Sequence, residues 1–147
     1  MPLFAASSRT DLREAWREAW RKHRQGLPLE PLEAQLADVV AIHPEYHATL
    51  EADRAVLERD WSPEQGESNP FLHMGLHLVV RDGIATDRPL GIRAVFERLL
   101  TLCGSGHEAE HLLLDCLAET LWEAQRAGAP ADEAAYLERA RRRISAA

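Results

Sequence analysis

Six of the seven histidines in this 147-residue chain fall into three pairs with one spacing, four residues apart. The pairs are His43 with His47, His73 with His77, and His107 with His111. A random scatter would produce only about 0.3 such pairs, and this spacing is the one that places two residues on one face of a helix. Two imidazoles placed in that way can converge on one ion. The spacing therefore predicts a metal site built from facing helices.

Acidic residues continue two of these pairs at the same four-residue step. Glu51 follows His47, and Asp115 and Glu119 follow His111. Six imidazoles with two or three carboxylates match the ligands of a dinuclear iron, manganese or zinc site, although a mononuclear site is also possible. Asp115 lies among leucines and Cys116, so we expect it to be buried and to complete the site, followed by Glu51 or Glu119. The alternative for Glu51 and Glu119 is a solvated helix face.

The third pair also permits a zinc hydrolase. The run from His107 to His111 reads His-Glu-Ala-Glu-His and matches both H-E-x-x-H and the inverted H-x-x-E-H. Glu108 or Glu110 would then be the general base that acts on a zinc-bound water. Against this interpretation, the run opens its helix, no strand is apparent to align a peptide, and Glu108 completes a capping box with Ser105.

A non-catalytic interaction protein is the other alternative, because tryptophan is enriched at interface hot spots. Trp16, Trp20 and Trp122 lie in predicted helices, where we expect them in the core. Trp61 lies in a predicted loop and is the candidate anchor for a partner. The histidines would then be pH-sensitive caps or core residues that form hydrogen bonds.

The elements that must position these residues all have helical periodicity, and no segment reads as a strand. Prolines near the starts and glycines near the ends predict helices over about 10–25, 31–42, 44–60, 70–83, 89–102 and 105–127, with a last one after Pro130. His43, which precedes a proline, is predicted to be a helix N-cap. We expect an all-α fold, a single-domain bundle of six to seven helices over residues 1–147.

Composition excludes several classes of protein. The net charge of −7 argues against nucleic-acid binding. The chain has no apolar run of about eighteen residues and no signal-peptide pattern at its start, so we expect no membrane span and a cytoplasmic location. Its two cysteines, Cys103 and Cys116, are expected to be reduced residues of the core. No nucleophilic triad or glycine-rich phosphate loop is present.

The strings around the histidines resemble a bacterial family of unknown function, DUF family 1841. The likeness is carried by Asn69-Pro-Phe-Leu-His-Met-Gly-Leu-His77, His43-Pro-Glu-Tyr-His47, His107-x-x-x-His111, Arg88-Pro-Leu-Gly-Ile-Arg93, Glu119-Thr-Leu-Trp-Glu-Ala-Gln125 and Tyr136-Leu-Glu-Arg139. It covers most of the chain. The resemblance implies a small cytoplasmic protein of proteobacterial type and brings no established activity, substrate or cofactor.

The set of candidate ligands is also similar in kind to that of hemerythrin-like di-iron bundles, although those proteins do not use three pairs of this spacing. This likeness concerns the chemistry of the ligands and does not imply homology. It implies that a metal cluster here could bind dioxygen, reduce peroxide or nitric oxide, or store or sense metal. We therefore expect a divalent metal ion as cofactor and a small oxygen species or another small molecule as partner.

Overall fold

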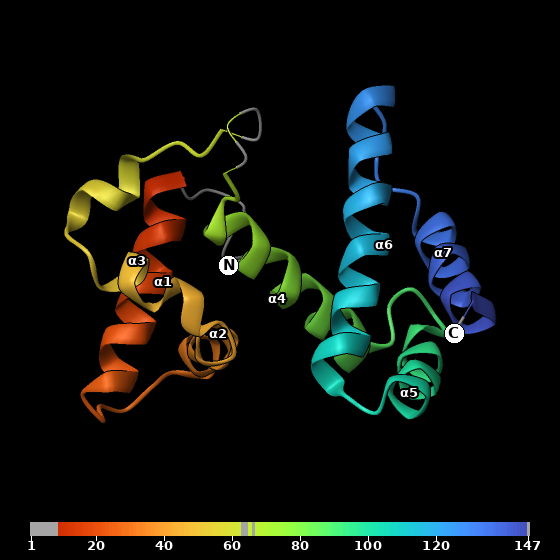
Figure 1. The fold of residues 1–147 in the computed structure, drawn as a ribbon, viewed down its shortest axis with the longest axis horizontal. Coiled ribbons are helices and arrows are strands. Elements are labelled where there is room, and N and C mark those ends of the chain that lie inside the picture. The colour runs from red at the N-terminus through yellow and green to blue at the C-terminus, as the bar shows by residue number, and fades with distance from the viewer. Residues whose placement is uncertain (1–8, 63–64, 66, 147) are drawn as a thin grey trace. The chain divides into compact units, whose positions relative to one another are not determined.

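The computed structural model describes residues 9–62, 65 and 67–146. These residues form seven α-helices and two short 3-10 helices and contain no strand, which confirms the predicted all-α fold of six to seven helices (Figure 1). In chain order the elements are α1 (Arg9–Arg24), α2 (Pro31–Ala41), η1 (Pro44–Tyr46), α3 (His47–Glu51), η2 (Arg54–Glu58), α4 (Pro70–Thr86), α5 (Ile92–Cys103), α6 (Gly106–Ala127) and α7 (Glu133–Ala146).

The chain divides into two compact units, Met1–Gly75 and Leu76–Ala147, which are described in turn. The division falls inside α4, which is one continuous helix from Pro70 to Thr86. The first unit thus holds the start of α4, and the second holds its remainder. A single domain over the whole chain stays a prediction.

In the first unit, α1 packs against α2 and also contacts α3 and η2. Trp16 and Trp20 are buried on α1, as predicted for core residues, and Leu36 is buried on α2. The guanidinium of Arg13 is buried too, and it donates hydrogen bonds to the carbonyl oxygens of Leu57 at 3.1 Å and of Arg59 at 2.7 Å. These bonds satisfy a buried charge and tie α1 to the segment around the end of η2.

The predicted helix over 44–60 is wrong, because three short elements, η1, α3 and η2, occupy this stretch. The break lies at Ala52 and Asp53, whose backbones are extended. The Asp53 carboxylate accepts a hydrogen bond from the backbone N–H of Ala55 at 2.8 Å. Aspartate side chains compete with helical hydrogen bonds in this way and start a new turn instead.

In the second unit, α6 packs against α5 and α7, and α5 also contacts α7. Its core contains Ile92 and Leu99 of α5, Leu113 of α6, Tyr136 of α7 and Val80 of α4. Each helix thus contributes a buried apolar stripe to one common core.

Two predicted boundaries in the second unit were too early. α4 continues past Gly83, where a Cβ atom would lie 2.8 Å from the carbonyl oxygen of Arg88, so this glycine permits a close approach and does not end the helix. α5 begins at Ile92 rather than Pro89, because Gly91 has a left-handed φ of 103° that an α-helix cannot include.

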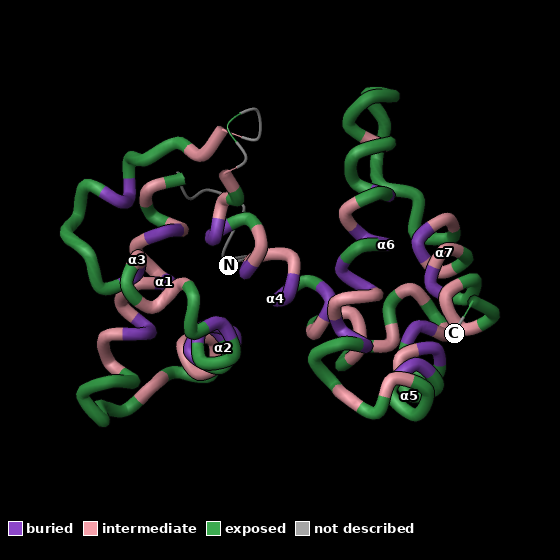
Figure 2. Tube along the Cα trace, in the orientation of Figure 1, coloured by how far each residue is buried: buried purple, intermediate pink, exposed green. Residues whose placement is uncertain are grey.

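The structure corrects the prediction for one tryptophan and confirms the predicted loop position of another, Trp61. Trp122, expected in the core, is 57% exposed, and the end of α6 that carries it is exposed in Figure 2. Trp61, the candidate partner anchor, is half-buried in the first unit, where it meets Phe71 at 5.9 Å between ring centroids and the guanidinium groups of Arg13 and Arg59. Its contacts within the chain therefore account for this tryptophan.

Cys116 is buried and Cys103 is half-buried, and both are free thiols, as predicted. Across the part of the chain that the structure describes, no helix has both the length and the apolar character that crossing a bilayer requires.

Candidate metal centre

The first unit brings together His43 and His73. His43 precedes Pro44, which keeps it out of the helical region, and η1 begins after it as predicted for an N-cap, although its side chain caps no backbone group. The ring is buried and its Nδ1–H donates to the carbonyl oxygen of Val39 at 2.8 Å. Since a carbonyl only accepts, the neutral ring carries its proton on Nδ1 and its lone pair on Nε2. His73 of α4 meets this ring edge-on, with 5.0 Å between centroids.

His47 and Glu51 serve the packing of the first unit. The Nε2–H of His47 donates to the carbonyl oxygen of Val40 at 2.9 Å, and its ring lies 4.4 Å from that of Trp20. The Glu51 carboxylate accepts a hydrogen bond from Trp20 Nε1 at 3.1 Å and forms an ion pair with Arg24 at 3.2 Å. These contacts occupy both residues and account for their positions.

The second unit holds two histidines whose Nε2 atoms face each other. His77 of α4 is fully buried, His111 of α6 is half-buried, and the two Nε2 atoms are 3.0 Å apart. Two nitrogens bound to one zinc-sized ion, each at about 2.0–2.1 Å, would be about 3.0–3.4 Å apart. The spacing of these two atoms therefore suits two ligands of a single ion.

A buried carboxylate orients His77. The Nδ1–H of His77 donates to Oε1 of Glu110 at 2.7 Å, and Arg81 Nε donates to the same oxygen at 2.8 Å. Burial raises the pKa of Glu110, but the hydrogen bonds from His77 and Arg81 outweigh burial and hold this pKa below its usual value. Glu110 is thus an anion that fixes the His77 proton on Nδ1, so in the neutral ring the lone pair lies on Nε2 and faces His111.

His111 and His107 are neighbours on α6. Burial lowers the pKa of His111, and the charges of His77 and His107 lower it further. A lowered pKa favours the neutral ring, which is the form that binds metal. His107 is exposed, and its ring centroid lies 4.3 Å from that of His111 and 6.0 Å from that of His77.

The acidic residues further along α6 lie outside this centre. Asp115 is exposed, which corrects its expected burial. It falls in a gap of the buried stripe of α6, between Leu114 and Cys116. Glu119 is also exposed, and its Oε2 lies 3.6 Å from Nε of Arg139 in α7. The expected burial of Asp115 is therefore wrong, and the roles of Asp115 and Glu119 as ligands stay predictions.

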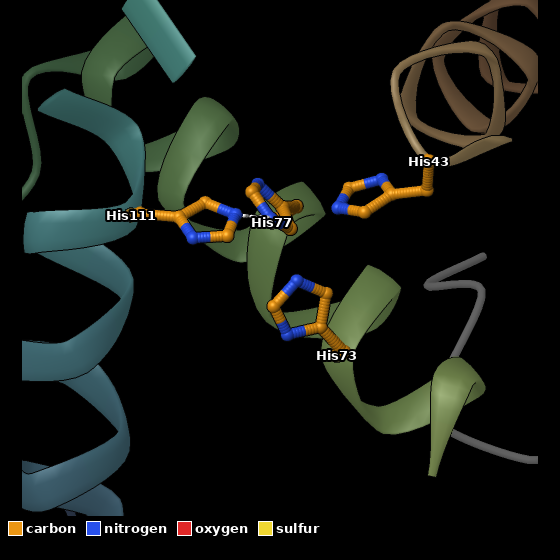
Figure 3. A group of neighbouring side chains, drawn as sticks. All are labelled: His43, His73, His77 and His111. Carbon is orange, nitrogen blue, oxygen red and sulfur yellow. Dashed lines mark hydrogen bonds between the residues drawn. The ribbon is translucent and has the colours of Figure 1, made fainter. Parts of the chain in front are cut away.

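Four histidines are candidate ligands of a metal ion, and each offers one ring nitrogen (Figure 3). They are His43 and His73 in the first unit, and His77 and His111 in the second. α4 carries two of them, one helical turn apart. His47, His107, Glu51, Asp115 and Glu119 are the predicted ligands that the group does not include.

Arg81 was not predicted to belong to the site, and Glu110 was considered only as a general base of the zinc-hydrolase alternative. A signal for Glu110 is nevertheless present, because it lies three residues before Leu113 and seven before Leu117. That register belongs to the apolar face of α6. An acidic residue on such a face needs a charged or hydrogen-bonding partner, which marks it as part of a buried polar site.

A family model described as "Domain of unknown function (DUF1841)" matches residues 8–142. No curated protein and no solved structure matches the chain significantly.

Proposed function

The chain belongs to this family of unknown function, and from its own residues we propose that it binds one divalent transition-metal ion through His77 and His111 of the second unit, with His73 and His43 as further candidate ligands. The observation that carries the proposal is the 3.0 Å approach of His77 Nε2 to His111 Nε2. Hydrogen bonding of His77 to a charged, buried Glu110 supports it further. A histidine that binds metal usually donates its other N–H to a carboxylate or carbonyl, as His77 and His43 do here.

The donor atoms favour iron(II) or zinc over manganese. All four proposed ligands are imidazoles, and imidazole suits zinc, iron, copper and nickel. Magnesium, calcium and manganese prefer carboxylate, carbonyl and water oxygens. The carboxylate of Glu110 is in contact with a proposed ligand, but His77 and Arg81 already occupy its Oε1.

The contacts favour one ion rather than two. A dinuclear site of the hemerythrin kind requires carboxylates that reach the metals, but Glu51 and Glu119 form ion pairs elsewhere and Asp115 is exposed. The positions of Glu110 and Glu108 also argue against the zinc-hydrolase alternative, in which one of them would be the general base. Glu110 is held by two donors, and Glu108 lies exposed in the first turn of α6.

The proposal is tested by elemental analysis of protein purified without a histidine tag or added metal, followed by titration of the metal-free protein with zinc or, without oxygen, with iron(II). We expect about one ion per chain, because His77 Nε2 and His111 Nε2 lie at the spacing of two ligands of a single ion. Protein that carries no metal and takes none up on titration would overturn the proposal.

The hydrogen bond from His77 to Glu110 leads to a prediction of its own. In Glu110→Gln the neutral amide loses the charge that raises the basicity of His77, so we expect metal affinity to fall about 10- to 100-fold while one ion still binds. Competition titration against a chromogenic chelator measures the change. Glu108→Gln is the matched control, since it makes the same change two residues away at an exposed position. Equal affinities in the two variants would contradict the role of Glu110.

A further inference from the structure

Three imidazoles of the second unit form a row that leads from the core to the surface. His77 is fully buried, His111 is half-buried and His107 is exposed. Neighbouring ring centroids in this row lie 4.7 Å apart between His77 and His111, and 4.3 Å apart between His111 and His107. Exposure therefore rises stepwise along a chain of potential metal ligands.

From this row we propose that His107 is the capture ligand of the metal centre, a residue that binds the incoming ion at the surface and passes it to His111 and His77. The inference rests on the proposed function and adds the route by which the ion enters and leaves. His107 thus affects the rates at which the ion binds and leaves, and it is not a ligand of the ion at equilibrium.

The chemistry of ligand exchange supports this role. A hydrated divalent ion loses its water one molecule at a time, and each loss costs less when a protein ligand replaces it at once. His77 cannot meet a hydrated ion, because its side chain has no exposed surface. His107 can meet one, and its ring lies beside that of His111, which is the next ligand inward. Because imidazole binds zinc and iron(II) well, the ion moves between ligands of like affinity.

The surroundings of His107 also suit the capture of a cation. Glu108 follows it in the first turn of α6 and is exposed. The chain as a whole has a net charge of −7, which attracts cations. The carboxylate of Glu108 offsets the positive end of the α6 dipole at this position.

The test compares the rates of zinc uptake and release with the amount of zinc bound at equilibrium. Metal-free wild-type and His107→Ala proteins are mixed with zinc in a stopped-flow instrument, and release is followed after addition of excess chelator. We expect both uptake and release to slow by about tenfold, which corresponds to about 1.4 kcal/mol on each barrier. The amount of zinc bound at equilibrium should stay at the wild-type value.

His23→Ala is the matched control, because His23 is likewise an exposed histidine on a helix and lies outside the centre. Its rates should equal those of the wild type. Addition of free imidazole to His107→Ala should restore the uptake rate, since it supplies the missing ligand from solution.

Two results would overturn the capture role while leaving the proposed function in place. Unchanged rates in His107→Ala would show that the ion enters without this residue. A loss of bound zinc at equilibrium would make His107 a permanent ligand. If the wild type itself binds no zinc or iron, the proposed function fails, and the capture role fails with it.

Discussion

Replacing His111 with alanine should weaken metal binding by at least about 100-fold, more than the roughly 10- to 100-fold that loss of an outer-shell partner costs. The substitution removes a nitrogen that faces His77 Nε2 at 3.0 Å. The exposed fraction of His111 is larger than that of His77, so the change should perturb the core less than His77→Ala would. Isothermal titration of the metal-free proteins measures the difference, and far-UV circular dichroism checks the helical content.

The matched control is His47→Ala, which alters the first helical position of α3 and removes a ring that packs on Trp20. The His47 Nε2–H is donated to the carbonyl oxygen of Val40, so we expect metal affinity close to that of the wild type. If the two variants lost affinity equally, the assignment of ligands by these contacts would be contradicted.

Removal of the metal should lower the melting temperature by about 5–10 °C. An ion present at 100 times its dissociation constant stabilises the native state by about 2.7 kcal/mol, and 1 kcal/mol corresponds to about 2–4 °C for a chain of this size. Differential scanning calorimetry with and without a chelator measures the shift. The double variant His77→Ala/His111→Ala should show no shift on addition of the chelator. A wild-type melting temperature that stays constant after confirmed removal of metal would contradict a metal site whose ligands come from packed helices.

The fold class could be predicted because its signals are local. Apolar periodicity, prolines at helix starts and glycines such as Gly128 at helix ends identify most of the helices. The stretch after Pro44 was mistaken for one long helix, because the capping of Ala55 by the Asp53 side chain depends on a backbone conformation that periodicity does not encode. Trp122 was mistaken for a core residue because an aromatic residue in a helix does not reveal whether a neighbouring helix extends as far as its position.

The candidate site could be predicted in part for the same reason. A four-residue spacing shows that two side chains share a helix face, as with His73 and His77. It cannot show which element that face meets. His47 has the spacing of a ligand but donates its Nε2–H to the carbonyl oxygen of Val40. Asp115 follows His111 at the same four-residue spacing but is exposed to solvent. Glu110 belongs to the centre through a residue 33 positions away in the sequence, and such a long-range contact leaves no periodic signal.

The pairing of Glu110 with Arg81 has a consequence for the oxidation state of bound iron. Arg81 balances the negative charge of Glu110, and the imidazoles that would hold the ion are neutral. Neutral imidazoles would not offset the third positive charge of ferric iron as carboxylate ligands do, and uncompensated charge is costly in a partly buried setting. The centre would thus raise the potential of the Fe³⁺/Fe²⁺ couple, and iron held there would remain ferrous in air for longer than iron in a carboxylate-rich site.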